Sequence, residues 1–123
     1  MMYRYDIPDI PPSNNKYIGR NVPWEYQKVK KQWAALINLK CRPKPPKPLE
    51  KAAVRLIYHF PDNRRRDPDN YSGKMILDGL VLAGIIKDDS FSCINLQLSA
   101  VYDNGGRTEI IIEEANSCTT KSS

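Results

Sequence analysis

The fold is decided by residues 64–84, RRRDPDNYSGKMILDGLVLAG, where a charged turn leads into the most apolar segment of the chain. Asn70 suits the N-cap of a helix over residues 71–83, and Gly84 suits its C-terminal cap. Apolar side chains cover most of the circumference of this helix, so we expect burial on nearly all sides. In a small domain, one of those sides is the leading candidate for contact with a second copy of the chain.

Alternating apolar and polar residues predict strands on both sides of this helix. The segment 51–60 precedes it, and the segments 93–102 and 108–113 follow it. Between the last two lies Asp103-Asn104-Gly105-Gly106, a strong hairpin signal. These patterns predict at least three strands in one sheet.

The N-terminal part adds a strand and a second helix. Residues 1–18 predict a short edge strand followed by a Pro/Asn loop, and a helix with one apolar face begins at Pro23. We therefore expect an α+β fold with a small mixed β-sheet and two main helices. It forms one domain over residues 1–115, followed by a polar tail over residues 116–123 that we expect to be disordered.

Composition excludes several classes of protein. The chain has 123 residues, no apolar run near the roughly 18 residues that span a membrane, and no apolar signal region at its start. Its three cysteines, Cys41, Cys93 and Cys118, are far apart and include no CxxC pair. This pattern favours reduced thiols in a cytoplasm over a disulfide framework or a zinc site.

Positive charge is concentrated in the first half of the chain. Residues 16–66 carry 14 lysines and arginines against 3 acids, whereas residues 67–123 carry 4 against 9. The basic half is either a set of ordinary solvated faces or a surface that grips phosphates. The cations that we expect to follow a DNA backbone are Arg64, Arg65, Arg66, Lys28, Lys31 and Arg107.

Two acidic pairs bracket the apolar helix. Asp67 and Asp69 precede it at i, i+2 spacing, which turns both to one side where the backbone is extended, and Asp88-Asp89 follows it. A helix of about 14 residues is about 20 Å long, so the pairs meet only where the chain returns. The segment 84–89, with its apolar Ile85-Ile86, is placed to provide that return.

Carboxylates without histidine or cysteine favour Mg²⁺ or Mn²⁺. Beside clustered cations they suit a metal that activates water against a phosphodiester, with Lys74 supplying positive charge at the scissile phosphate. The alternative is that Asp67 and Asp69 cap the helix and balance the arginine run. In that case Lys74–Asp78 is a surface ion pair at i, i+4.

Taken together, these motifs resemble the RusA family of Holliday junction resolvases, which are crossover junction endodeoxyribonucleases. The resemblance covers nearly the full length, and its order and spacing are far more specific than any single part. One departure is that Lys74 lies four residues after Asn70, where some members have three, so we place a one-residue insertion near Ser72-Gly73. The matching segments are PPSNNKY at 11–17, RRRDPDN at 64–70, KMILDGL at 74–80, AGIIKDD at 83–89 and GGR at 105–107.

The resemblance implies a Mg²⁺-dependent enzyme, with Mn²⁺ as a second candidate metal, that resolves four-way DNA junctions by paired symmetric nicks in recombination and repair. Asp67, Asp69 and Asp89 match the metal-binding carboxylates, and Lys74 matches the catalytic lysine. Asp89 is preferred to Asp88 because the essential acid of the family matches the second of the pair. A RusA-like homodimer is also implied, since two equivalent sites suit a junction with approximate two-fold symmetry. The competing hypotheses are a nuclease for flaps or other branched DNA and a junction-binding module that does not cut.

Overall fold

A computed structural model describes residues 2–13 and 23–115 of the chain. The loop predicted after the first strand therefore lies largely outside the described residues, as does the tail predicted from residue 116. Within the described part, no helix is long and apolar enough to cross a membrane.

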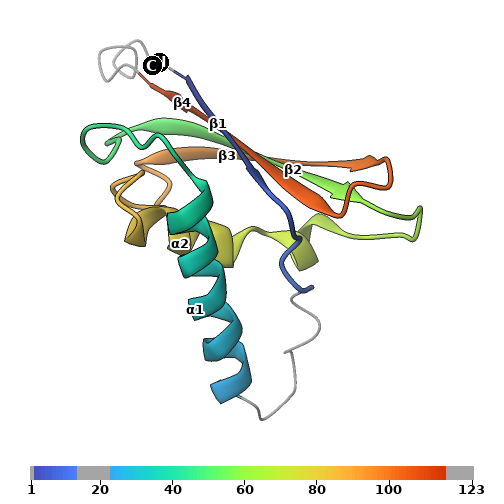
Figure 1. Cartoon of the computed structure of the whole chain (residues 1–123). Coiled ribbons are helices and arrows are strands. Elements are labelled where there is room, and N and C mark those ends of the chain that lie inside the picture. Colours follow the sequence, from blue (N-terminus) through green and yellow to red (C-terminus); the bar gives the residue numbers. More distant parts are fainter. Residues whose placement is uncertain (1, 14–22, 116–123) are drawn as a thin grey trace.

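Four strands form one mixed sheet in the order β1-β4-β2-β3 (Figure 1). Strand β4 pairs antiparallel with both β1 and β2, and β2 pairs parallel with β3. The predicted α+β class and mixed sheet are confirmed, with β1 at one edge. The strands are β1 (Met2–Ile7), β2 (Ala52–Phe60), β3 (Ile94–Tyr102) and β4 (Arg107–Glu114).

The turn after β3 is not a hairpin, so that prediction is wrong. Because β2 lies between β3 and β4, residues 103–106 cross the end of β2 and span two strand spacings, about 10 Å. The Asp103 N–H donates to the Phe60 carbonyl at 3.2 Å. Gly105 passes so close that a Cβ there would lie 2.6 Å from the Cβ of His59. Turn residues specify the local bend, but they do not specify which strands become neighbours.

Both α-helices cover one face of the sheet, and the first turns of α1 extend away from it (Figure 1). The predicted start of the second helix is wrong, because Asn70 lies inside a separate 3₁₀ helix and Gly73 is the N-cap. Gly73 has a φ of 83° and packs against the side chain of Leu56. This turn at Gly73 separates the 3₁₀ helix from the α-helix that follows it. The helices are α1 (Pro23–Lys40), η2 (Pro68–Tyr71) and α2 (Lys74–Leu82).

Helix α2 is buried within a single copy of the chain. Its residues Met75, Ile76, Leu77, Gly79 and Leu80 are all buried, and Leu82 is the exposed apolar residue. The apolar character of α2 is therefore explained by the core of one chain, which corrects our choice of this helix as the leading dimer interface.

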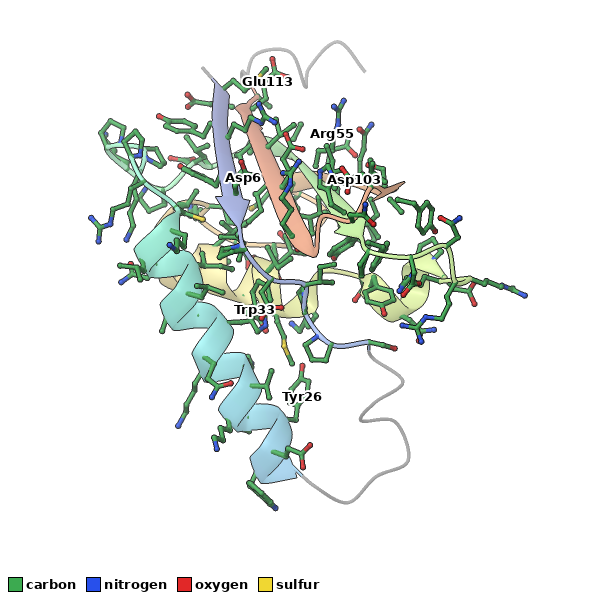
Figure 2. All side chains as sticks on the ribbon, turned by 45° about the vertical axis from the view of Figure 1, so that its right-hand side comes forward. Asp6, Tyr26, Trp33, Arg55, Asp103 and Glu113 are labelled. Carbon is green, nitrogen blue, oxygen red and sulfur yellow. The ribbon has the colours of Figure 1, made fainter. Side chains whose placement is uncertain are left out.

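Among the residues that the structure describes, no helix lies on the opposite face of the sheet. In Figure 2, Arg55 and Glu113 lie on this open face, whereas Trp33 lies between α1 and the core. As predicted, α1 is one-sided: Trp33 is buried, and Lys28 and Lys31 are exposed. Of the cysteines in the described part, Cys41 and Cys93 are both free thiols.

Candidate active site

The arginine run lies in the turn after β2, and its members are not equivalent. The Arg66 guanidinium packs 4.2 Å from the ring centre of Phe60, and its side chain is only 10% exposed. Arg66 also donates to Asp62 Oδ1 at 2.9 Å, whereas Arg64 and Arg65 are 80% and 89% exposed. Hydrogen bonds from the Arg64 N–H and side chain lower the pKa of Asp62 to about 2. Arg66 thus stabilises the turn, and Arg64 and Arg65 point into solvent.

Asp67 begins the 3₁₀ helix η2 without capping it through its side chain. Its backbone is extended, at φ −105° and ψ 140°, and its carbonyl accepts from the Asn70 N–H at 3.0 Å. The carboxylate makes no cap hydrogen bond and instead faces Arg65 Nε at 3.2 Å. The capping part of the alternative is therefore wrong for Asp67, whereas the contact with Arg65 agrees with its other part, the balance of the arginine run. The Asp67 carboxylate is half-exposed and remains accessible to a ligand.

The backbone of Asp69 is helical, so the extended i, i+2 arrangement proposed for Asp67 and Asp69 is also wrong. Pro68 holds the residue before it in an extended conformation, but the 3₁₀ turn begins at Pro68 itself. The side chain of Asp69 is not among those that the structure describes. Its role therefore stays a prediction from the sequence.

Helix α2 presents Lys74 on its first turn beside Asp78. Lys74 Nζ lies 3.1 Å from Asp78 Oδ1, in the predicted i, i+4 pair. The second oxygen, Asp78 Oδ2, is buried and lies 3.3 Å from Lys30 Nζ of α1, an ion pair without hydrogen-bond geometry. One carboxylate therefore joins lysines from two helices.

Lys30 is a site residue that the sequence analysis missed. It shares one helical stripe with Tyr26, Trp33 and Ile37, at spacings of three and four residues. That stripe is the face that packs toward α2. The sequence predicts an apolar face on this helix, and a lysine on that face indicates a cation that points toward the protein interior.

The chain returns after α2 and brings Asp89 toward Lys74. Ile85 and Ile86 are fully buried, and Leu49 forms a parallel bridge with Ile86. The Asp78 carboxylate raises the pKa of Lys74 most strongly, and the nearby Asp89 carboxylate raises it further. The chain thus turns back after α2 and places a second acid within electrostatic reach of Lys74, while the predicted meeting of the two acidic pairs stays a prediction.

The donor set agrees with a hard divalent cation. The accessible acids, Asp67 and Asp89, offer only oxygen ligands, which Mg²⁺ and Mn²⁺ prefer. Among the side chains that the structure describes, no three His, Cys, Asp or Glu gather closely enough to hold a metal. Asp69 is not among these side chains, so the described acids alone supply an incomplete set.

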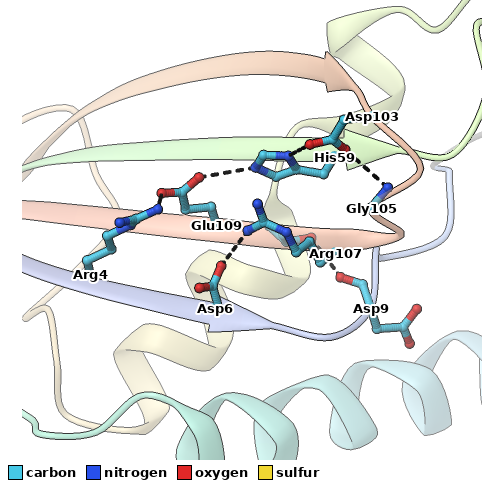
Figure 3. A network of polar contacts seen from close by, with 9 residues as sticks. Arg4, Asp6, Asp9, His59, Asp103, Gly105, Arg107 and Glu109 are labelled. Atoms are coloured by element: carbon cyan, nitrogen blue, oxygen red, sulfur yellow. Dashed lines mark hydrogen bonds and ion pairs between the residues drawn. The ribbon is translucent and has the colours of Figure 1, made fainter.

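A second polar cluster lies on the open face of the sheet (Figure 3). His59 Nδ1 is 2.9 Å from Asp103 Oδ2, and His59 Nε2 is 3.1 Å from Glu109 Oε1. Arg4 also pairs with Glu109. His59 therefore links β2 to β4 and to the crossing turn, which is a structural role.

Arg107, the remaining candidate for DNA contact, also lies in this cluster. Its Nη1 is 2.7 Å from Asp6 Oδ1, across the pair of β4 and β1 (Figure 3). The side chain of Arg107 is 36% exposed, so it is less accessible than the side chains of Arg64 and Arg65.

The fold and the site together define a small α+β domain in which acids, two lysines that share one carboxylate, and exposed arginines lie near helix α2 and the turn before it. In a comparison with protein-family models, residues 9–113 match the family described as Endodeoxyribonuclease RusA. The chain therefore belongs to the RusA family of endodeoxyribonucleases, which act on Holliday junctions and generally depend on a divalent metal. A search of curated proteins finds no match.

Proposed function

We propose that the chain is a Mg²⁺-dependent endonuclease that resolves four-way DNA junctions by paired, symmetric nicks. It would act as a homodimer in the cytoplasm, in recombination and repair. The observation that carries this proposal is the return of the chain after α2, which brings Asp89 toward Lys74. Membership of the family supplies the class of substrate.

Asp67, Asp69 and Asp89 are the residues proposed to hold the metal. A divalent ion bound there lowers the pKa of a water and stabilises charge on a phosphodiester. The Lys74 ammonium stabilises the negative charge that develops at the scissile phosphate. Arg64, Arg65, Lys28 and Lys31 are exposed and hold the DNA backbone by charge.

The function is tested with a synthetic four-way junction, a linear duplex and a flap, each with and without Mg²⁺. Paired symmetric nicks in the junction alone are the expected result. Cleavage of the flap at an equal rate would favour the branched-DNA alternative. Tight junction binding without cleavage in either Mg²⁺ or Mn²⁺ would establish the non-cutting alternative instead.

The metal assignment is tested by Asp69→Asn. This variant should lose cleavage while binding the junction as tightly as the wild type or more tightly, because it removes a ligand and also a negative charge near DNA. Cleavage is measured on labelled junctions, and binding is measured by gel shift without metal. Normal cutting by Asp69→Asn would show that the metal ligands are assigned wrongly.

A further inference from the structure

The carboxylate of Asp78 is shared between two ammonium groups that approach from different helices. Lys74 Nζ lies 3.1 Å from one oxygen, and Lys30 Nζ lies 3.3 Å from the other. The Asp78 side chain is only 18% exposed, whereas Lys74 is 59% exposed. An ion pair on a solvated surface has two mobile side chains and contributes little to stability. Here the Asp78 carboxylate is held between the two helices, and the Lys74 side chain extends from it toward solvent.

Close packing of α1 on α2 creates this arrangement. Gly79 follows Asp78, and a Cβ at Gly79 would lie 2.8 Å from Ile37 Cδ1 and 3.5 Å from the Ala34 Cα. The missing side chain lets α1 approach the turn of α2 that carries Asp78. Lys30, one turn before Ala34 on α1, thereby reaches the second oxygen of Asp78.

We infer that Asp78 is a positioning residue that aims Lys74 at the scissile phosphate, and that Lys30 anchors Asp78 from α1. This inference rests on the proposed function of Lys74. A lysine has many rotamers, and an ammonium held at a fixed carboxylate is confined to a few of them. The Asp89 carboxylate also raises the pKa of this ammonium, so Lys74 lies within electrostatic reach of one proposed metal ligand. Lys30 needs no contact with DNA in this arrangement.

The first test is Asp78→Asn, which keeps the size of the side chain and removes its charge. Cleavage of a four-way junction is measured at saturating enzyme in a single turnover, and the junction Kd is measured without metal. The rate should fall by about 10- to 100-fold, the cost of a small misplacement of a reacting group. The Kd should stay equal or become tighter. Lys40→Gln, an exposed lysine on the same helix as Lys30, should change neither quantity.

The second test is a double-mutant cycle. If Asp78 acts through Lys74, Asp78→Asn should slow cleavage no further in a Lys74→Gln background. Likewise, Lys30→Gln should slow the wild type severalfold and leave Asp78→Asn unchanged.

Three results would overturn the inference. The first is a cleavage rate for Asp78→Asn within twofold of the wild-type rate, and the second is a double variant with Lys74→Gln in which the two rate losses multiply. The third is a rate loss in Asp78→Asn that is matched by weaker junction binding and a lower melting temperature. If the wild type itself cuts no junction, the proposed function fails first, and the two failures are thereby distinguished.

Discussion

At the scale of single residues, the surroundings of His59 predict a large effect on stability. Its side chain is buried, and each ring nitrogen contacts a carboxylate, Asp103 or Glu109. His59→Leu keeps much of the volume but leaves Glu109 buried without this partner. We expect the free energy of unfolding to fall by about 2–4 kcal/mol at pH 7, as measured by urea denaturation.

This loss should depend on pH through Glu109. Burial raises the pKa of Glu109, but hydrogen bonds from His59 and Arg4 outweigh burial and hold the pKa below its ordinary value. A group with a lowered folded-state pKa stabilises the fold above its unfolded pKa and loses that contribution as pH falls through the folded value. The difference between wild type and variant should therefore shrink below about pH 4. The control is Arg55→Leu, because Arg55 is exposed on the same strand and the same face of the sheet. Its free energy of unfolding should stay within about 0.5 kcal/mol of the wild-type value. A loss as large as that of His59→Leu would contradict the structural role assigned to His59.

The same residues show which contacts a sequence can reveal. Asp78 lies four residues from Lys74, so helical periodicity alone predicted their pair. The partners of His59 lie 44 and 50 residues away along the chain, in a turn and a strand that no local pattern connects to it. Long-range polar pairs depend on strand order, which the sequence pattern left open.

At the scale of elements, the turn between η2 and α2 depends on Gly73. Its φ is 83°, and a Cβ there would lie 2.4 Å from Leu56 Cδ1. Gly73→Ala should lower the free energy of unfolding by about 2–4 kcal/mol, from left-handed backbone strain and overpacking together. Gly84 has a similar φ of 76° with no atom within 4 Å of a built Cβ. Gly84→Ala should therefore cost only about 1–2 kcal/mol, and equal losses would show that Leu56 does not matter.

Patterns of hydrophobicity located every strand and both long helices, because burial of one face repeats at a fixed period. They failed at the start of α2, where Asn70 lies inside the 3₁₀ helix η2 and Gly73 is the N-cap instead. They failed again at residues 103–106, where turn residues that suit a hairpin carry the chain across β2. In both places the local signal is compatible with two structures, and packing against Leu56 or His59 selects one of them.

At the scale of the whole molecule, the uneven charge of the chain predicts how binding responds to salt. The first half contributes exposed cations on α1 and in the turn after β2, where the side chain of Arg65 is 89% exposed, whereas the side chain of Arg107 on β4 is only 36% exposed. Each cation that neutralises a phosphate releases a counterion, so the slope of log Kd against log salt counts such contacts. We expect Arg65→Gln to reduce that slope by about one, and Arg107→Gln to reduce it clearly less.

The slope is measured with the Asp69→Asn variant, which should bind without cutting, between about 50 and 200 mM salt. Arg65 is almost fully exposed in a turn that leads directly to Asp67, so a phosphate held there lies beside the proposed site. Arg107 lies on the sheet face opposite α1 and α2, so a phosphate held there would require DNA on that side of the sheet. An equal fall of the slope for both variants would mean that DNA contacts both faces of the sheet. The proposal that the DNA backbone passes Arg64 and Arg65 and not Arg107 would then be wrong.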